Sequence, residues 1–352
     1  MKLFIRVLIV LYLSACSNHE QSSIFSDFAQ IMELEVTDSL DLENFGILNP
    51  HYIQYKDSFL VFCSMTGNRE MYYWNLRSDY VTVRDVIGQG VDEMPQYSIV
   101  KTDSPTSFCF ADHRRGKIYE MNLGKLQNDS AAKHSLAYNL PVEEGNHPLR
   151  FFETENYIYG IGLFKDGRIY SFDKRTGKAI VSMDYPLNED VERLDYIHKG
   201  ALFTGTLMAG NEKTLVLSCF GLIDFYDILP DGNLVLKQNY HYSFPKFQTM
   251  EVGKVITFSR DDIYGISDMN ADERFVYLLY SGKNLRDKGD DTFNCSHLLV
   301  YDWNGNPVIH CELPKSLYNF CVAGDVLYGL SRESIPKVYV YSLNSIYMNL
   351  NK

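Results

Sequence analysis

The stretch HLLVYDWNGNP, residues 297–307, alternates apolar and polar side chains and then reaches an Asn304-Gly305 dipeptide. Alternation with a period of two is typical of a strand with one buried face, and Asn-Gly favours the tight turn of a β-hairpin. The sequence therefore predicts a strand that runs directly into a hairpin.

Five other stretches of the chain repeat this pattern. The six copies each pair an aromatic residue or Met with Asn, Asp or Ser: Trp74-Asn75, Met121-Asn122, Phe172-Asp173, Tyr226-Asp227, Tyr301-Asp302 and Tyr341-Ser342. Successive second members are separated by 47, 51, 54, 75 and 40 residues. Loose repetition near this period, with about four strands per repeat, is how a β-propeller appears in sequence.

We therefore predict an all-β fold, a six-bladed β-propeller of four-stranded antiparallel blades. The first strands of the blades are expected at 51–56, 96–102, 149–155, 201–208, 254–259 and 317–324. The sixth blade ends with the strand 337–343, and the rest of the chain is too short and polar for a fourth strand. Because proteins avoid an exposed sheet edge, we expect the spare strand IMELEVT, residues 31–37, to close this blade. The propeller then spans residues 31–345, and residues 346–352 form a C-terminal tail.

The composition of the chain limits its partners. Its 352 residues include 26 Tyr and 21 Phe, an aromatic content that suits packed sheets. The 33 basic and 45 acidic residues give a net charge of −12. We expect no nucleic-acid partner, because non-specific binding to nucleic acid requires a basic surface.

The N-terminus has the pattern of an export signal. Lys2 and Arg6 precede an apolar run at 3–13 that is short for a membrane-spanning helix. The following Leu13-Ser14-Ala15-Cys16 resembles a bacterial lipobox, in which cleavage precedes a Cys that is then acylated. The sequence predicts a lipoprotein signal peptide at 1–15 and a lipidated Cys16, with a flexible tether at 16–30. The alternative is an ordinary secretory signal with a chance cysteine.

Six cysteines remain after Cys16, and an even number in an exported protein invites disulfide pairing. They are Cys63, Cys109, Cys219, Cys295, Cys311 and Cys321. Cys63, Cys109 and Cys219 lie in apolar strands of different blades, a pattern that indicates small buried hydrophobic residues. Cys295 and Cys311 form the one pair that we retain as a candidate disulfide.

The segment VIGQGVDEM, residues 86–94, resembles a motif of the TolB-like six-bladed propeller lipoproteins of Bacteroidota, G-x-G-Q-G-P-x-E-F. Gly88, Gln89, Gly90 and Glu93 match it, whereas Val91 replaces the usual Pro and Met94 the aromatic residue. The lipobox and the early closing strand are similar as well, and the resemblance covers roughly residues 25–345. It implies a six-bladed propeller on a lipid anchor, and it implies no established catalytic residues.

Propeller sites usually lie on the face formed by the loops between second and third strands and the loops between blades. On this face the sequence places a set of candidate ligand-binding residues of mixed charge: Glu93, His113, Arg114, Arg115, His147, Arg150 and Arg260. Arg332-Glu333 lies in one of the same loops. Arginine binds carboxylates or phosphates through paired hydrogen bonds, so an anionic or carbohydrate-like ligand would suit this face. The alternative is that these residues pair with one another across solvated loops.

No catalytic or metal site emerges from the motifs. Asp112 and His113 are adjacent in a strand and point to opposite faces, which argues against an acid–base pair. Neither Asp261-Asp262 nor Asp290-Asp291 has the spacing of an EF-hand, and no zinc motif, P-loop or nucleophile elbow occurs. We therefore expect no cofactor and no metal.

The expected function is a binding or scaffold module for an envelope protein or a small ligand, anchored to a membrane by its N-terminal lipid. A propeller enzyme acting on glycans, a hydrolase or a lyase, is the alternative. Ser17 after the Cys, without a following acidic run, favours the periplasmic side of the outer membrane. The propeller is expected to be monomeric.

Overall fold

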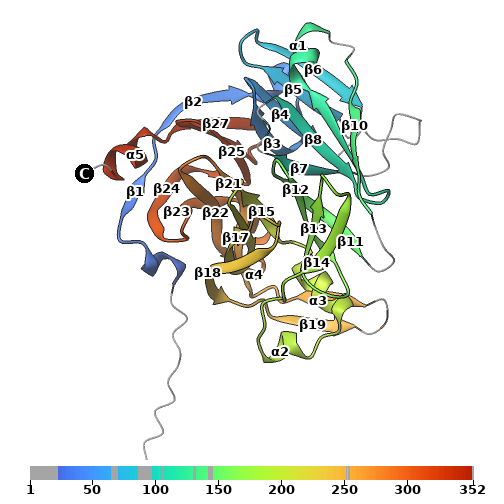
Figure 1. Ribbon diagram of the computed structural model, residues 1–352. Helices are drawn as coiled ribbons and strands as arrows, with labels where there is room; N and C mark the ends of the chain where they lie inside the picture. The colour runs from blue at the N-terminus through green and yellow to red at the C-terminus, as the bar shows by residue number, and fades with distance from the viewer. Residues whose placement is uncertain are drawn as a thin grey trace, which may run out of the picture.

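The computed structural model describes residues 23–64, 70–85, 97–102, 104, 106–129, 132–141, 146–250, 252 and 254–350. Its strands form six blades around a common centre, as predicted (Figure 1). Within these described residues, no helix is long and apolar enough to span a membrane.

The first three blades follow the predicted strands closely. Blade one contains β3 (Pro50–Lys56), β4 (Phe59–Ser64), β5 (Glu70–Asn75) and β6 (Tyr80–Asp85). Blade two contains β7 (Ser98–Thr102), β8 (Ser107–Asp112), β9 (Lys117–Asn122) and β10 (Ser135–Asn139), with the short helix α1 (Leu123–Asn128) before its last strand. Blade three contains β11 (His147–Glu153), β12 (Tyr157–Leu163), β13 (Ile169–Asp173) and β14 (Lys178–Ser182). The innermost strands β7 and β11 pair in parallel, which joins blades two and three into one sheet.

Blade four corrects one predicted strand. It contains β15 (Leu207–Gly210), β16 (Thr214–Cys219), β17 (Gly221–Ile228) and β18 (Leu234–Ser243). The strand expected at 201–208 begins instead within the helix α3 (Tyr196–Phe203), which follows the short α2 (Glu189–Glu192), and only its last residues belong to β15. Asp195 caps α3 by accepting a hydrogen bond from the His198 backbone N–H, and this local signal outweighs the apolar run that follows.

Blade five corrects a second strand. Its sheet contains β21 (Ile263–Ala271), β22 (Phe275–Asn284), β23 (Cys295–Asp302) and β24 (Pro307–Leu317). The segment expected to begin this blade is β20 (Val255–Phe258), which pairs only with β19 (Phe247–Met250) in a separate hairpin between blades four and five. The predicted insertion at 283–296 is ordered by α4 (Leu285–Lys288) and η3 (Gly289–Phe293).

The N-terminal strand closes blade six, as expected, but with shifted residues. Blade six contains β25 (Asn319–Ala323), β26 (Val326–Ser331) and β27 (Lys337–Ser342), and β2 (Val36–Asp41) pairs with β27 as the fourth strand. The first part of the expected closing strand, β1 (Ile31–Glu33), instead adds in parallel to β24 of blade five. The segment thus spans the outer edges of two blades (Figure 1).

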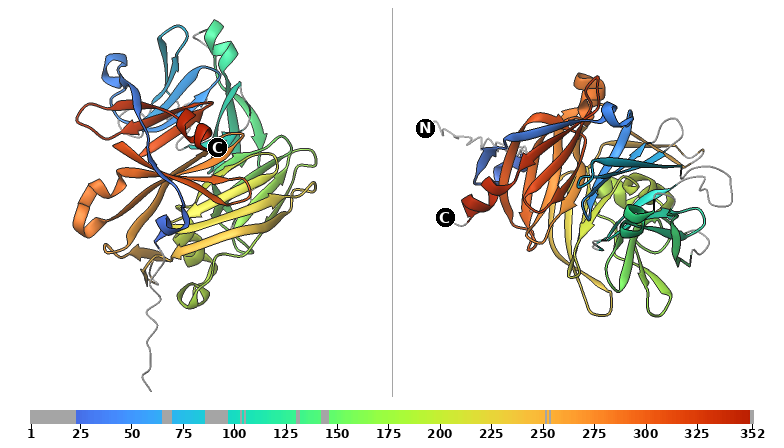
Figure 2. Two further views of the ribbon diagram at one scale, coloured as in Figure 1. Left: turned by 90° about the vertical axis from the view of Figure 1, so that its left-hand side faces the viewer. Right: turned by 90° about the horizontal axis from the view of Figure 1, so that it is seen from above.

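The ends of the chain are more ordered than the sequence suggested. We expected a flexible tether up to residue 30, yet residues 24–27 form the single turn η1 (Ile24–Asp27). Ile24 and Phe28 are buried in the core between blades four and five, because the turn directs both apolar side chains inward. At the other end, α5 (Asn344–Leu350) buries Ile346 and Tyr347 against blades five and six. The two terminal segments lie on the same side of the molecule (Figure 2).

The core is divided among the contacts between blades. Six clusters of buried side chains each combine residues from two neighbouring blades. Central strands such as β4, FLVFCS, are buried along their whole length because they have a blade on either face. The six cysteines after Cys16 are free thiols buried in this core, so the candidate Cys295–Cys311 disulfide is absent. Cys311 lies opposite Leu298, and Cys295 opposite Leu317, which separates the two along the ladder.

Candidate functional site

A central channel is surrounded by the innermost strands β3, β7, β11, β15, β21 and β25, and a cavity lies toward each of its ends. We call the end where these strands begin the entry end and the opposite one the exit end. The entry cavity, of about 390 Å³, is lined by His51, Tyr52, Cys63, Tyr97, Ser98, Ile99, Lys101, Arg150, Phe151, Leu207, Met208, Tyr264, Ser267, Asp268, Phe293, Tyr318, Asn319 and Arg332. The predicted binding face, built from loops between blades and between second and third strands, corresponds to the entry end.

Lys101 lines both cavities and forms a buried ion pair between them. Its Nζ lies 3.6 Å from Asp268 Oδ1 and donates a hydrogen bond to the Met269 carbonyl. Asp268 also accepts hydrogen bonds from Asn319 Nδ2 (2.6 Å) and from the backbone N–H groups of Met269 (2.9 Å) and Phe320 (3.0 Å). Burial lowers the pKa of Lys101 and raises that of Asp268, because both charged forms lose solvation.

The same network joins blade one. Asn319 Oδ1 accepts a hydrogen bond of 2.7 Å from the backbone N–H of Ile53 on β3. The innermost strands of blades one, two, five and six are thus connected through Asn319, Asp268 and Lys101. These buried polar groups satisfy one another and hold the channel in one arrangement.

Two arginines give the entry cavity a positive charge. Arg150 on β11 and Arg332 after β26 are both exposed, and neither forms an ion pair with any described residue. Glu333, next to Arg332, instead accepts a hydrogen bond from Tyr339 Oη at 2.6 Å. The carboxylate that lines this cavity within the described residues, Asp268, is already paired with Lys101. The two guanidinium groups therefore remain available to a ligand.

Burial and the positive charges of Arg332 and Arg150 lower the pKa values of neighbouring basic groups. The pKa of His51 is lowered by burial and then by the charge of Arg332. Arg150 acts in the same direction on Lys101 by charge repulsion, although burial is the larger cause there. Among the described residues that line it, the entry cavity carries a net positive charge, in a chain whose own net charge is −12.

Aromatic side chains form the walls beside these charges. The Arg332 guanidinium lies 4.6 Å from the ring centroid of Tyr318 and 5.7 Å from that of Phe293, within the range of cation–π contact. Tyr264 packs edge-on against Phe293 at 4.9 Å. The Tyr318 hydroxyl donates a hydrogen bond to the Pro50 carbonyl, which fixes its ring at the rim. The cavity thus combines fixed aromatic surfaces with two guanidinium groups that form no ion pair with a described residue.

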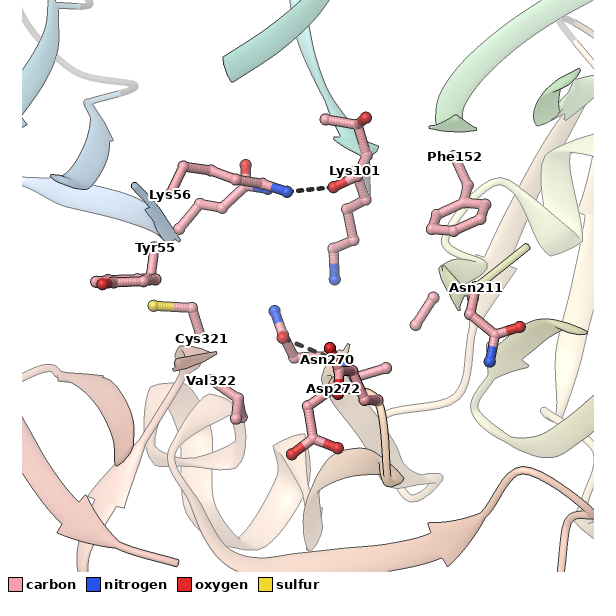
Figure 3. A pocket seen from close by; sticks show the side chains of 15 residues that line it. Tyr55, Lys56, Lys101, Phe152, Asn211, Asn270, Asp272, Cys321 and Val322 are labelled. Carbon is pink, nitrogen blue, oxygen red and sulfur yellow. Dashed lines mark hydrogen bonds between the residues drawn. The ribbon is translucent and has the colours of Figure 1, made fainter. Parts of the chain in front are cut away.

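The exit cavity, of about 410 Å³, has a different character. Figure 3 shows the Lys101 amine projecting into it, while the Lys56 amine turns to a backbone carbonyl of Thr102. Asp272 accepts hydrogen bonds from the hydroxyls of Tyr277 (2.8 Å) and Tyr347 (3.1 Å) and from two backbone N–H groups, so it is held in a structural role. The polar groups of Lys56 and Asp272 in the exit cavity are thus hydrogen-bonded within the protein.

Only one of the sequence-predicted candidates lines the entry cavity, namely Arg150. Arg114 and Arg115 are exposed on the β8–β9 loop, where Arg115 lies 3.6 Å from the Asp112 carboxylate. His113 is half-buried on the same loop, and burial lowers its pKa. His147 and Arg260 are exposed outside the cavity. Glu93 and the lipidation site Cys16 lie outside the described residues.

Several residues of the cavity were not identified from the sequence. Lys101 lies within the strand predicted to begin blade two, so its charge inside an innermost strand was the available signal. Asp268 lies outside the strand expected to begin blade five at 254–259, and the tyrosines resemble the many others in the core. Arg332 lies in a loop of the expected face, and the structure shows that it has no carboxylate partner among the described residues.

The described residues contain no cluster of three or more His, Cys, Asp or Glu side chains that would hold a metal ion. A Lewis-acid or metal-binding role is therefore not assigned to this site.

The fold and the site agree with a comparison against protein families. Residues 27–325 match the family described as TolB-like 6-blade propeller-like, and the chain belongs to this family. No curated protein matches the sequence.

One solved structure supports the propeller fold, and two others match more weakly. The β-propeller domain of Cps50 (Swd1) from Myceliophteria thermophila superposes with a TM-score of 0.52 at 11% identity, covering 88% of this chain and 99% of that one. Hydrazine synthase of Kuenenia stuttgartiensis has a TM-score of 0.40 at 13% identity and covers 80% and 92% of the two chains. BamB from Moraxella catarrhalis has a TM-score of 0.39 at 11% identity and covers 82% and 84%. At 11% identity the first of these likenesses concerns the propeller fold alone.

Proposed function

We propose that this chain is a lipid-anchored protein of the bacterial cell envelope whose propeller binds a small anionic ligand at the entry end of its channel. The observation that carries the proposal is the pair Arg150 and Arg332, which have no carboxylate partner among the described residues and flank an aromatic cavity. Guanidinium groups bind carboxylates and phosphates through paired, charge-assisted hydrogen bonds. Tyr264 and Tyr318 offer surfaces for a ring, so a sugar acid is the ligand class that fits best.

The anchor rests on the N-terminal sequence. A basic start, an apolar run at 3–13 and Leu13-Ser14-Ala15-Cys16 support acylation of Cys16. Ser17 and the lack of an acidic run after it support the periplasmic side of the outer membrane. Mass spectrometry of the mature N-terminus tests the lipid, with Cys16→Ser as the variant that loses it. Proteolysis of intact cells tests the side, because a periplasmic domain is expected to survive.

A binding module is favoured over a glycan-degrading enzyme. A glycosidase requires two carboxyl groups flanking the scissile bond. Asp268, the carboxylate described in the entry cavity, accepts three hydrogen bonds and pairs with Lys101, so it is not free to act as an acid or a base. A bacterial propeller that presents a rigid, charged channel mouth is suited to recognition.

Thermal unfolding in the presence of matched sugars tests the ligand class. Galacturonic acid is expected to raise the melting temperature, by on the order of 1–3 °C at saturating concentration, whereas galactose is not. Replacing Arg150 and Arg332 together by Gln is expected to abolish the shift, because each charge-assisted hydrogen bond contributes about 1.5–3 kcal/mol. Arg114→Gln, an exposed change outside the cavity, is the matched control and is expected to keep the shift.

Two results would overturn the ligand proposal. One is the absence of stabilisation by galacturonic acid, inorganic phosphate and sulfate alike. The other is an equal shift in the double variant and the wild type, which would place anion binding elsewhere.

A further inference from the structure

The hairpin β19–β20 carries an exposed apolar tip. Met250, Val252 and Val255 are 51%, 86% and 42% exposed, on a sheet of only two strands. The other side of the hairpin is fixed to the body, since Phe247 and Ile256 pack against the cluster beneath α2 and α3. Phe258 also lies 5.0 Å from the ring of Phe220. The apolar tip therefore projects from a firmly packed base.

The hairpin lies at the entry end of the propeller. It is inserted between the outermost strand of blade four and the innermost strand of blade five, and β21 begins at Ile263, five residues after Phe258. Tyr264 at this start lines the entry cavity. The segment between blades thus places the hairpin beside the mouth that contains Arg150 and Arg332.

The N-terminal segment is held at the same end. Ser23 and Ile24 line a small cavity of about 160 Å³ together with Ile263 and Gly265. The turn η1 is fixed by buried Ile24 and by a hydrogen bond of 2.5 Å from Tyr242 Oη to Asp27. The chain therefore leaves the folded domain at Ser23, on the face that bears the hairpin. Both η1 and β19 lie in the lower half of the view in Figure 1.

The length of chain before this point limits the distance to a lipid anchor. Cys16 precedes Ser23 by seven residues. Seven residues span at most about 25 Å even when fully extended. A lipid on Cys16 would thus keep the entry face of the propeller close to the membrane surface.

We propose that the apolar tip of β19–β20 inserts into the membrane interface and orients the entry end of the channel toward the bilayer. This inference rests on the lipid anchor of the proposed function. The tip can enter the interface because it exposes methyl-bearing side chains, and because water in the headgroup region still reaches the open edges of this two-stranded hairpin. The sequence also places Glu251 and Lys254 at this tip, and Lys254 Nζ lies 3.0 Å from Asp195 Oδ2, which compensates its charge. A lipid chain and an apolar loop together give the two contacts that stable peripheral attachment requires.

An environment-sensitive fluorophore at the tip tests this orientation. The six cysteines after Cys16 are buried, so a new surface cysteine can be labelled selectively with a nitrobenzoxadiazole dye. Val252→Cys and Val255→Cys report on the tip, and Val83→Cys, equally exposed at 42% on the outer strand of blade one, is the matched control. The full-length lipoprotein is placed in vesicles of phosphatidylethanolamine and phosphatidylglycerol. We expect the tip labels to shift their emission to the blue and to be quenched by doxyl-labelled lipids, and the label at 83 to do neither.

The outcomes separate the inference from the function on which it rests. Equal behaviour at positions 252 and 83, or a change at 252 only when other envelope proteins are added, overturns membrane insertion; the second result would identify a protein-docking surface. If Cys16 carries no lipid, the anchor of the proposed function fails. The insertion is then measured on a chain that begins at residue 16 with a His-tag bound to nickel-chelating lipids, and the same comparison of labels decides it.

Discussion

Lys101 Nζ lies 3.6 Å from Asp268 Oδ1 in the middle of the channel, where the two side chains separate the entry cavity from the exit cavity. The two residues are far apart in the sequence and come from blades two and five. Their side chains are only 19% and 5% exposed. The ion pair therefore joins opposite parts of the ring through a poorly solvated contact.

The effects of replacing Lys101 and Asp268 on the free energy of unfolding are expected to be strongly non-additive. Asp268→Asn or Lys101→Met alone leaves one buried charge without its partner, which costs about 3–5 kcal/mol. The double variant is expected to lose clearly less than the sum of the two single changes. Urea unfolding measures all four proteins. Lys237→Met, which removes a surface pair with Asp227, is the control and should cost no more than about 1 kcal/mol. Additive losses would show that the two charges do not depend on each other.

The N-terminal segment that contains β1 and β2 closes the ring, and two variants test its contribution to stability. Leu34 lies between β1 and β2 and is fully buried in the core between blades five and six. Leu34→Ala should destabilise the whole domain by about 2–5 kcal/mol, because it leaves a cavity in a core shared by two blades. Ile31→Ala, at a site 63% exposed in the same segment, should change stability by about 0.5 kcal/mol or less. Similar melting temperatures for the two variants would contradict closure of the ring by this segment.

The cysteines provide a chemical test of the core. Burial raises the pKa of Cys63, Cys295 and Cys311 to about 12 and that of Cys219 to about 11. Since the thiolate is the reactive form, a folded chain that begins at Ser23 should not react with Ellman's reagent at neutral pH. In concentrated guanidinium chloride without reductant, all six thiols should react. Recovery of only four would indicate that Cys295 and Cys311 form a disulfide.

Two histidines beneath η1 predict a dependence of stability on pH. His297 Nδ1 lies 3.0 Å from His310 Nε2, and Phe25 stacks on His310 with ring centroids 4.5 Å apart. Burial lowers the pKa of both rings; His310 is lowered further by His297, and His297 by Lys283, while Glu312 opposes these effects. Two protonated rings cannot share this hydrogen bond, because both nitrogens would be donors.

The sign of the effect follows from the lowered pKa values. The unfolded chain binds protons more readily than the folded one near and below the ordinary histidine pKa of about 6.5. The stability from this pair is therefore complete above about pH 6.5 and is lost as the pH falls through the lower folded values. Replacing both by Gln should flatten this part of the curve relative to wild type in urea unfolding from pH 7.5 down to about 4.5. His51 and His113 titrate in the same direction in both proteins, so the difference between the curves isolates the pair. Parallel curves would exclude a contribution of the pair.

Much of the fold was predictable because each strand and turn depends on residues close together in the sequence. The copies of the Tyr301-Asp302 pattern each lie in the third strand of a blade, and most predicted strands match within a few residues. The errors occurred where an apolar run served another purpose. The run at 201–208 begins within helix α3, which the Asp195 cap starts, and joins blade four only from Leu207. The run at 254–259 forms half of an inserted hairpin. The pattern of apolar and polar residues alone cannot distinguish a blade strand from an inserted helix or hairpin of similar composition.

The site was far less predictable. Loop position indicated the entry end, where Arg150 lines the cavity, but Arg114, Arg115, His147 and Arg260 do not reach that cavity. These residues lie in the same kind of loop, but their side chains do not all reach the cavity. The tyrosines of the cavity are, in sequence, indistinguishable from those that fill the contacts between blades.

The sequence by itself determined the number of blades, the strand pattern and the presence of a spare N-terminal strand, because these depend on side chains within a few residues of one another. The tertiary structure decided which residues meet in the channel: Lys101 is neutralised by Asp268, while Arg150 and Arg332 have no carboxylate partner among the described residues. It also divided the closing strand between β1 on blade five and β2 on blade six. The physical reason is that pairing and charge compensation depend on distances in space between blades, to which separation along the chain is no guide.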